Sequence, residues 1–510
     1  MTRVGLVSLY TVESNGIRYL AAALRQAGIP TDECYVGYHL HRVRRRFEPQ
    51  VAAQLVDHMR ARGVGLVGIS LRTGALLQLA IELTRTLKRE LGVPVVWGGA
   101  HVSMAPDDCL DHADYLVLGE GEAAICELAR KVLAGESARD VPNVWTKVGG
   151  QVHKTALRLL VDDLDALPFP DYHSHQDKYW FRDGSVYQGE PLARAPSYRV
   201  VVTRGCPRNC SFCGVSAFRK LYHGQGHFYR RRSVENAIQE LESVRRVCPS
   251  IRRIRFDDEL FVPEHEWIEE FCREYPRRVG LPFDIVSSPQ DLDDWTIDAL
   301  AEAGLDQVYL GIQSSSTANR WRYGRGISDE DVVRCISRLH ARRVYPAAQI
   351  LIDDPEASET EKRELLELLL RLPRPFDLYI FSLCHYPGSA TTRRLLASGT
   401  ISKDEVEGAN DKGLRQYIAD FSYPRSDTDR LLLALYMLSN KRGVPRAGVR
   451  FLASNRYLNA HPGPVVAAAG AVNLGKLVVR GTSALVRGEL SWLQVRQWLG
   501  DLKGWSSLPI

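Results

Sequence analysis

Three cysteines lie close together in the segment TRGCPRNCSFCG, where Cys206, Cys210 and Cys213 show the spacing C-x3-C-x2-C. Cysteine thiolates are the usual ligands of iron–sulfur clusters, and a 4Fe-4S cube is normally held by four of them. Three thiolates leave one iron open, and an open iron can bind and activate a small molecule. The spacing therefore predicts a 4Fe-4S cluster with one accessible iron.

A zinc site is the alternative for the same thiols. A tetrahedral zinc site usually adds a fourth Cys or His at paired spacing, and His223 and His227 could supply this ligand. Phe212, directly before the third cysteine, favours the iron–sulfur interpretation instead.

The three cysteines and Phe212 together resemble the signature of radical S-adenosylmethionine (SAM) enzymes. The resemblance implies that the open iron chelates the amine and carboxylate of SAM. Reductive cleavage then yields a 5′-deoxyadenosyl radical that abstracts hydrogen from an unactivated carbon. It also implies an electron donor such as flavodoxin or ferredoxin. The hard chemistry belongs to the cofactors, while the protein binds and orients them.

The same resemblance places polar contacts to SAM at the ends of later strands. Glu259 in FDDELF is a candidate for the SAM amine, and its neighbour Asp258 is a candidate for the substrate. Ser287 and Ser288 stand where the family often contacts the carboxylate or ribose of SAM. Gln313 stands where many relatives have Glu, and would bind the same groups. Each residue could instead cap a helix or close a loop, which is common for Asp and Ser.

The elements that must position these residues begin with a region of α/β alternation. Short apolar runs alternate with amphipathic stretches over residues 1–150, which predicts a parallel sheet with helices between its strands. Strands are expected at RVGLVSLY, TDECYVGY, VGLVGISL, VPVVWGGAH and ADYLVLGEGE. Ligands of such sheets bind beyond the carboxyl ends of the strands.

This region resembles the Rossmann-like cobalamin-binding domain that precedes many radical SAM cores. The matching segments are GISLRTG (68–74), GGAHVSMAPDDCL (98–110) and DYLVLGEGEAAICEL (114–128). Glycines let a backbone approach a large planar ligand closely, because they lack a Cβ. The resemblance assigns cobalamin contacts to polar and glycine residues of these segments: Ser70, Arg72, Thr73, Gly98, Gly99, His101, Gly119, Glu120, Gly121 and Glu122.

Many free-standing cobalamin domains bind cobalt through the His of a D-x-H-x-x-G motif. None of the candidate histidines has that context: His39, His41, His58 and His101. The resemblance therefore implies cobalt without a protein His below it. A Rossmann-like domain for a nucleotide is the alternative. No G-x-G-x-x-G follows the first expected strand, which weakens a dinucleotide interpretation.

A second α/β region begins at residue 198 and contains six strand–helix units. A complete (β/α)8 barrel has eight, so the pattern predicts the partial (β/α)6 barrel that the cysteine signature implies. The expected organisation is a cobalamin-binding domain at 1–150, a linker at 151–197, a radical SAM core at 198–400, and a mostly helical, basic domain at 401–510.

The bulk composition is that of an ordinary globular protein, with 45% hydrophobic and 25% charged residues. Ten scattered cysteines argue against a disulfide framework and for a reducing compartment. The N-terminal segment lacks the apolar run of a signal peptide, so a cytoplasmic location is expected.

Positive charge gathers in the C-terminal region. From Arg430 to the end of the sequence, eleven Lys and Arg stand against two acidic residues, Glu489 and Asp501. A helical cap that packs on the barrel is the favoured interpretation, and contact with a membrane surface is the alternative. No RNA-binding module is recognisable, so nucleic acid is not expected as a partner. The Arg-rich segment RWRYGRG (320–326) is interpreted as a solvated loop, with an anionic substrate as the alternative.

The two cofactors together favour methylation of an unactivated carbon in a small natural-product or lipid-like substrate. Such a carbon is no nucleophile, whereas methylcobalamin can give a methyl group to a carbon radical. Family members that cyclise, contract rings or oxidise use the same two domains, so a non-methylating enzyme is the first alternative. A non-catalytic cobalamin-binding sensor would leave the cluster loop unused. An RNA methylthiotransferase would need three further cluster cysteines, and Cys34, Cys109 and Cys126 are too dispersed for this.

Overall fold

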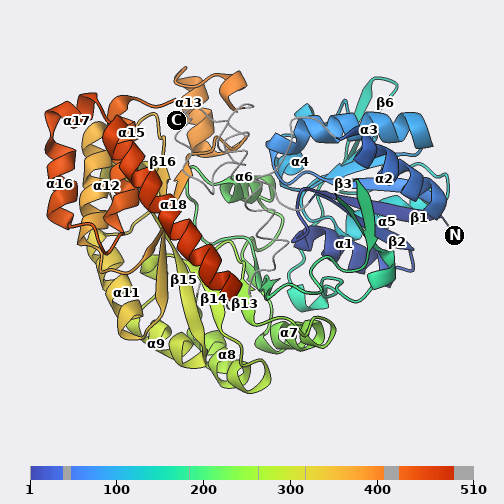
Figure 1. Cartoon of the computed structure of the whole chain (residues 1–510). Helices are drawn as coiled ribbons and strands as arrows, with labels where there is room; N and C mark the ends of the chain where they lie inside the picture. Colours follow the sequence, from blue (N-terminus) through green and yellow to red (C-terminus); the bar gives the residue numbers. More distant parts are fainter. Residues whose placement is uncertain are drawn as a thin grey trace. The chain divides into compact units, whose positions relative to one another are not determined.

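The protein's structure, a computed structural model, describes residues 2–37, 48–182, 184–261, 263–315, 317–406 and 424–486. Figure 1 draws the helices and strands of the chain, coloured from the N-terminus to the C-terminus. The chain divides into two compact units: the first holds residues 1–283 and 384–414, and the second holds residues 284–383 and 415–510.

The N-terminal part of the first unit is built on a nine-stranded sheet of order β7-β6-β5-β4-β3-β1-β2-β8-β9. Strands β1 to β5 and β8 run parallel, and β6, β7 and β9 pair antiparallel at the edges. The strands are β1 (Arg3–Leu9), β2 (Thr31–Val36), β3 (Val64–Ser70), β4 (Val95–Gly98), β5 (Tyr115–Val117), β6 (Val144–Val148), β7 (Gln151–Lys154), β8 (Lys178–Arg182) and β9 (Ser185–Gln188).

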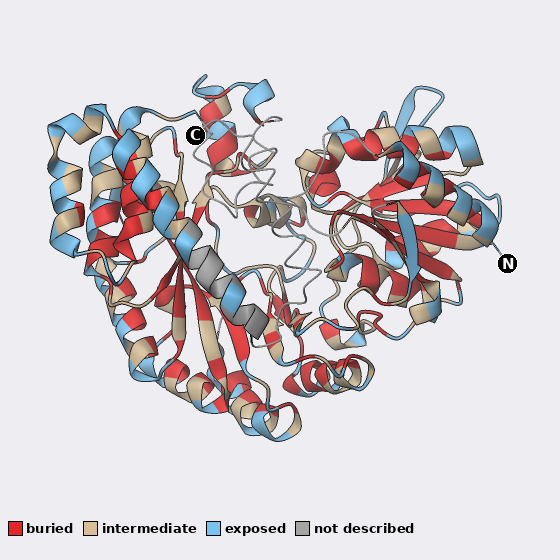
Figure 2. Cartoon of the chain, viewed as in Figure 1, coloured by how far each residue is buried: buried red, intermediate tan, exposed pale blue. Residues whose placement is uncertain are grey.

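Helices cover both faces of this sheet, because each has one apolar stripe that it buries against the strands. The helices are α1 (Asn15–Gln26), α2 (Pro49–Arg62), α3 (Leu77–Leu91), α4 (Ala100–Met104) and α5 (Glu122–Leu133). Leucines of α2 and α3 enter one hydrophobic core, and residues of α1 and α5 enter a second. The result is the three-layer α/β arrangement that the alternating sequence pattern predicts, and Figure 2 shows its buried strands.

Residues 151–197 carry more regular structure than the sequence pattern suggested. Strand β8 extends the sheet by pairing with β2, although it begins with a lysine. Lys178 is fully buried, and its ammonium lies 2.7 Å from a carboxylate oxygen of Glu190. Buried charges paired in this way break the apolar pattern that marks a strand in a sequence, so this strand was missed.

The second α/β region supplies a six-stranded sheet of order β10-β13-β14-β15-β16-β17, as expected for the partial barrel. Its strands are β10 (Ser197–Val200), β13 (Arg253–Phe256), β14 (Phe283–Ser287), β15 (Leu305–Gln313), β16 (Tyr345–Ile352) and β17 (Asp377–Ser382). The helices that alternate with them are α7 (Val234–Val247), α8 (His265–Arg278), α9 (Asp294–Ala303), α11 (Asp329–Ala341) and α12 (Glu359–Arg371).

Several short elements of this region were not predicted. They are β11 (Thr203–Arg204), β12 (Arg230–Arg231), α6 (Gly214–Leu221), α10 (Thr317–Tyr323) and α13 (Ala390–Ala397). Elements of two to eight residues carry too little hydrophobic periodicity to be recognised without their neighbours.

The C-terminal region is helical, as expected. It contains α15 (Asp427–Ser439), α16 (Arg446–Ser454), α17 (Arg456–Ala460) and α18 (Gly463–Val486). Helix α15 buries a leucine-rich face and contacts α12, α16, α17 and α18. Among the described residues, no helix is both long and apolar enough to cross a membrane.

Candidate active site

The three cysteines of the first unit lie in the loop between β11 and α6. Cys210 is buried, and Cys206 and Cys213 are half-buried. Loss of solvation and, after it, the negative charge of Glu259 raise the pKa of Cys213 to about 12. Loss of solvation also raises the pKa of Cys206, and the negative charges of Cys210 and Glu259 raise the same pKa. The three thiols and Glu259 therefore lie within electrostatic reach of one another.

This group of thiols fits an iron–sulfur cluster. Metals bind the thiolate form, and burial is the main cause that disfavours this form and raises the pKa values of Cys206 and Cys213, with repulsion from neighbouring thiolates adding to it. Iron in the cluster would supply the positive charge that reverses this shift. Three thiolates and no fourth cysteine in the loop match a cube with one open iron.

Backbone contacts hold the cluster loop in shape. Gly205 has a φ of +82°, and a Cβ there would lie 2.1 Å from the carbonyl oxygen of Phe228. The guanidinium of Arg219 donates to the Cys206 carbonyl and lies 4.9 Å from the centre of the Phe228 ring. Helix α13 adds a hydrogen bond of 2.9 Å from the Thr391 amide to the Ser211 carbonyl. Phe212, between these contacts, is half-buried.

The histidines of the zinc alternative point elsewhere. The side chain of His227 is 84% exposed, and its Nδ1 lies 3.1 Å from Asp162. His223 is exposed at the surface. Within the described ranges, no group of three or more His, Cys, Asp or Glu is arranged to hold a single metal ion.

Asp258 closes the loop that leads to the cysteines. Its Oδ1 accepts hydrogen bonds from the amides of Val202 (3.0 Å) and Thr203 (2.6 Å) and from the Thr203 hydroxyl (2.6 Å). Burial raises the Asp258 pKa to about 6, and the Thr203 hydrogen bonds oppose this shift. The structure thus gives the Oδ1 of Asp258 a loop-closing role, while its Oδ2 is buried without a hydrogen-bond partner among the described residues, so the substrate contact stays a prediction.

Glu259 is exposed and stands between the cysteine loop and the cobalamin-type sheet. Loss of solvation raises its pKa, while the positive charge of Arg72 lowers it. Arg72 is exposed and follows directly after β3. Glu259, in the loop after β13, therefore lies within electrostatic reach of Arg72 and of the thiols of Cys206 and Cys213. Ser70 and Thr73, on either side of Arg72, are half-buried.

The loop after β4 is shaped by a glycine. Gly99 has a φ of +105°, and a Cβ there would lie 2.7 Å from the carbonyl oxygen of Leu71. Gly98 has no such tight neighbour and is half-buried. These two glycines let the loops after β3 and β4 lie close together at the carboxyl edge of the sheet.

His101 offers an unused hydrogen-bonding atom near this edge. Its side chain is buried, and its Nε2 has no hydrogen-bond partner among the described residues. Burial lowers the His101 pKa, which keeps the imidazole neutral. A buried polar atom without a partner costs stability, so this nitrogen fits a contact with a bound cofactor. His58 instead stacks on Tyr179 and lies 3.3 Å from Asp32, while His39 and His41 fall outside the described residues.

The turn after β5 contacts the cysteine segment directly. Gly119 has a φ of +71°, and a Cβ there would lie 1.8 Å from the Tyr222 hydroxyl oxygen. The carboxylates of Glu120 and Glu122 both form ion pairs with Arg204. Gly121 lacks a left-handed φ, and a Cβ there would meet Leu20 at 3.3 Å.

In the second unit, Ser287 and Ser288 are both buried at the end of β14. The Ser288 hydroxyl accepts a hydrogen bond of 3.0 Å from Arg325, which also donates to the Gly311 carbonyl at 2.6 Å. Arg325 belongs to the Arg-rich segment read as a solvated loop, and this reading was wrong. Arg320 of the same segment is also buried and donates to the Ser314 carbonyl.

Gln313 ends β15 in a strained conformation. Its φ is +67°, and the strand register shifts between Gly311 and Gln313. Its Oε1 is buried without a hydrogen-bond partner in the part of the chain that the structure describes. Strained residues and unsatisfied polar atoms concentrate at functional sites. The ends of β14 and β15 thus gather Ser288, Gln313 and Arg325 in one place.

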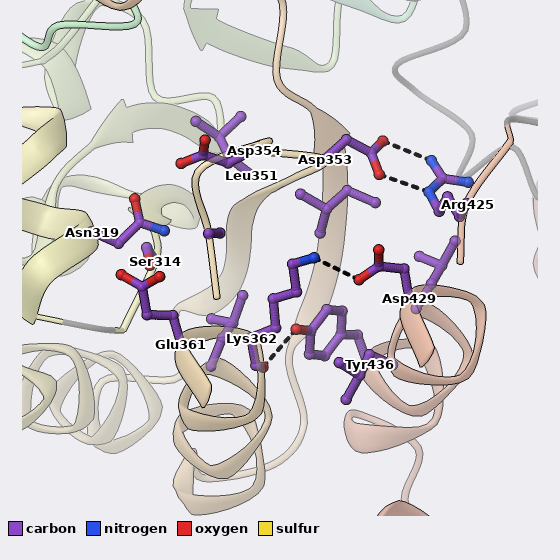
Figure 3. Close-up of a pocket in the computed structure, with 15 residues that line it drawn as sticks. Ser314, Asn319, Leu351, Asp353, Asp354, Glu361, Lys362, Arg425, Asp429 and Tyr436 are labelled. Atoms are coloured by element: carbon purple, nitrogen blue, oxygen red, sulfur yellow. Dashed lines mark hydrogen bonds and ion pairs between the residues drawn. The ribbon is translucent and has the colours of Figure 1, made fainter. Parts of the chain in front are cut away.

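A cavity of about 40 Å³ lies at the end of β16 in the second unit (Figure 3). Asp353 accepts two hydrogen bonds from Arg425, at 2.7 and 2.8 Å, and Lys362 lies 2.7 Å from Asp429. The Tyr436 hydroxyl donates to the Lys362 carbonyl at 2.6 Å. This volume suits only a few water molecules, and these charges are paired, so the cavity is not a substrate site.

Two protein families match the chain in the order that the structure displays. Residues 1–129 match the B12 binding domain, and residues 200–369 match the radical SAM superfamily.

Related sequences fall in the same class. An uncharacterized methyltransferase, PH0819, from Pyrococcus horikoshii is 27% identical over 61% of this chain and 64% of its own length. The bacteriochlorophyllide d C-8(2)-methyltransferase of Chlorobaculum tepidum is 25% identical over 68% of this chain and 71% of its own. The anaerobic magnesium-protoporphyrin IX monomethyl ester cyclase of Rubrivivax gelatinosus is 25% identical over 61% of this chain and 54% of its own length. The chain thus spans less than two thirds of the first and third relatives.

Among solved structures, the radical SAM methyltransferase TsrM of Kitasatospora setae, with cobalamin and a 4Fe-4S cluster bound, shares the fold. Its TM-score is 0.63 at 18% identity, over 78% of both chains. The cobalamin-dependent SAM radical enzyme OxsB, with aqua-cobalamin and SAM bound, gives a TM-score of 0.65 at 14% identity, over 99% of this chain and 84% of its own. The chain therefore carries a B12 binding domain followed by a radical SAM domain, and it shares the fold of these cobalamin-dependent radical SAM enzymes.

Proposed function

We propose that this protein is a methyltransferase that adds a methyl group to an unactivated carbon of a small natural-product or lipid-like molecule. One observation carries the proposal: Glu259 lies within electrostatic reach of Cys206 and Cys213 on one side and of Arg72 on the other. This supports a cluster and a cobalamin that are held near the same carboxylate. When bound, the cluster with SAM supplies a carbon radical and cobalamin supplies the methyl group.

In this proposal the residues of the first unit hold the cluster and one end of SAM. Cys206, Cys210 and Cys213 bind three irons as thiolates. Glu259 accepts a hydrogen bond from the SAM amine, because a carboxylate in a partly desolvated site binds an amine strongly. Arg72 favours the charged form of Glu259, so the carboxylate can serve as an acceptor without losing a proton first.

By the resemblance to the family, Ser287, Ser288 and Gln313 are proposed for the other polar groups of SAM. Arg325 presents a guanidinium beside Ser288 and suits a carboxylate. The strained Gln313 offers an amide to the ribose hydroxyls, and Ser287 lies buried next to Ser288. The unsatisfied Oε1 of Gln313 supports a hydrogen-bonding role.

Cobalamin is assigned to the loops after β3 and β4. The polar side chains of cobalamin would form hydrogen bonds with Ser70, Thr73 and His101. The loop backbone could approach cobalamin closely at Gly98 and Gly99. The proposed domain bounds are 1–150, 151–197, 198–400 and 401–510. We also propose a flavodoxin or ferredoxin as the electron donor, and a cytoplasmic location.

A non-methylating reaction is the second candidate. A magnesium-protoporphyrin IX monomethyl ester cyclase is among the relatives that match this chain. Ring formation is therefore the most specific non-methylating reaction to consider. The bacteriochlorophyllide methyltransferase is matched over 71% of its own length, whereas the cyclase is matched over 54%, which is why methylation stands first.

The deciding experiment is anaerobic reconstitution of the full chain with iron, sulfide, hydroxocobalamin and SAM labelled in its methyl group. Tetrapyrroles, polycyclic lipids and aromatic metabolites are screened as substrates, with a Cys206→Ala/Cys210→Ala/Cys213→Ala variant as the control. Label in the product together with 5′-deoxyadenosine supports methylation. Unlabelled product with 5′-deoxyadenosine favours cyclisation or oxidation. Absence of 5′-deoxyadenosine under reducing conditions would leave only a cobalamin-binding sensor.

A further inference from the structure

The turn after β5 is fastened to the cysteine-bearing segment on both sides of the cluster loop. One fastening involves Arg204, two residues before Cys206, and the other involves Tyr222, directly after α6. Both contact the turn formed by residues 119–122, which the sequence assigned to cobalamin. These contacts form a polar network, named here the Glu120 clasp: Glu120, Glu122, Arg204, Tyr222 and Arg230.

The first fastening is ionic. Arg204 and Arg230 pair across the β11–β12 ladder, so their guanidinium groups stand side by side. Arg230 donates to both oxygens of Glu120, at 2.8 and 3.2 Å, and Arg204 lies 3.4 Å from Glu120 and 2.5 Å from Glu122. The side chains of Arg230 and Glu122 are only 4% and 12% exposed. A multidentate network with this little exposure is more rigid than a surface ion pair.

The second fastening is a hydrogen bond at a glycine. The Glu120 amide donates to the Tyr222 hydroxyl at 2.6 Å. The neighbouring Gly119 leaves room for that hydroxyl, which would lie 1.8 Å from a Cβ. The Ser103 hydroxyl of α4 also accepts from the Gly119 amide at 2.8 Å. The turn is therefore tied to α4 of its own sheet and to the end of α6.

The carboxylate of Glu120 has little capacity left for a cofactor. Its Oε1 is engaged by Arg230 and Arg204, and its Oε2 by Arg230 and, at 3.3 Å, by the Val161 amide. These positive charges hold the Glu120 pKa below its usual value despite burial. A charged acceptor committed to four contacts within the protein is suited to holding segments together.

We propose that the Glu120 clasp fixes the separation between the cobalamin-binding loops and the cluster, so that Glu120 and Tyr222 are positioning residues and not cofactor ligands. The clasp ties the sheet that carries the loops after β3 and β4 to both arms of the cluster loop. The substrate carbon would have to lie within reach of both the 5′-deoxyadenosyl radical and cobalamin, so the placement of the two cofactors matters, since a displacement of about 1 Å can cost roughly 100-fold in rate. The inference needs both cofactors bound but does not depend on methyl transfer.

The test compares Glu120→Gln and Tyr222→Phe with the wild-type holoenzyme, reconstituted with the cluster and hydroxocobalamin. Glu127→Gln is the matched control, because Glu127 lies on α5 and pairs with Arg158, away from the cluster loop. It makes the same charge change on the same segment. The main readout is the electron paramagnetic resonance coupling between the reduced cluster and cob(II)alamin. Iron content, hydroxocobalamin affinity and thermal unfolding are measured alongside.

We expect both clasp variants to keep full iron content and to bind hydroxocobalamin within about 3-fold of wild type. The spin coupling between the cluster and cob(II)alamin should change, because a shift of about 1 Å in the placement of the cofactors matters. Glu127→Gln should match wild type in all readouts. Unchanged coupling in both clasp variants overturns the proposal. A loss of hydroxocobalamin affinity of about tenfold or more in Glu120→Gln, with unchanged coupling at saturation, overturns it too, since Glu120 would then be a cofactor ligand. If Glu120→Gln fails to fold, Tyr222→Phe decides, because it removes a single oxygen.

Discussion

Gly119 is a position where a single added carbon should disturb the site. In Gly119→Ala the new Cβ would lie 1.8 Å from the Tyr222 hydroxyl and 2.5 Å from its ring carbon, so the tyrosine must move. The φ of +71° adds about 1–2 kcal/mol for any residue with a Cβ. Displacing a buried aromatic ring and its hydrogen bond adds roughly 2–4 kcal/mol. The expected loss of stability is therefore about 3–6 kcal/mol.

A double-mutant cycle isolates the steric part of this effect. In a Tyr222→Ala background, Gly119→Ala should cost only the conformational part, about 1–2 kcal/mol. The interaction energy between the two sites should then be about 2–4 kcal/mol. The assay is urea unfolding of the cofactor-free chain, compared at the first transition for wild type, both single variants and the double variant. Additive effects of the two substitutions would show that Tyr222 does not occupy the space beside Gly119.

Three further predictions concern other contacts. Asp258→Asn should gain stability relative to wild type as pH rises from about 4 to 6, by about 3 kcal/mol. In wild type, burial raises the Asp258 pKa to about 6, so the folded chain binds the proton more tightly and stability is lost over that interval; parallel pH–stability curves would contradict this. Gln313→Gly should relieve the positive φ, stabilising the chain by about 1 kcal/mol while weakening SAM binding in calorimetry; unchanged SAM affinity would remove Gln313 from the site. Lys178→Ala should lower the free energy of unfolding by about 3–5 kcal/mol, because it breaks a fully buried ion pair with Glu190, whereas the exposed Lys88→Ala should cost under about 1 kcal/mol.

Much of the fold follows from local pattern. The apolar runs that predict β1, β3 and β16 are long enough to be recognised alone. The strands that were missed fail this test for a physical reason. Strand β8 contains Lys178, whose charge is paired with Glu190, twelve residues later in the chain, and lies 3.9 Å from both Glu33 and Asp171. No local pattern can show such a partner.

By itself, the sequence determined the chemistry that starts the reaction, because three cysteines at short spacing must lie within one loop whatever the rest of the chain does. It also determined which loops gather at the carboxyl edge of each sheet. Only the tertiary structure decided which polar residues remain available there. Asp258 is bonded to Thr203 and Glu120 to Arg230, whereas Glu259 faces the thiols and Arg72. These carboxylates look alike in sequence, and they differ because hydrogen bonds and ion pairs form between segments that only folding brings together.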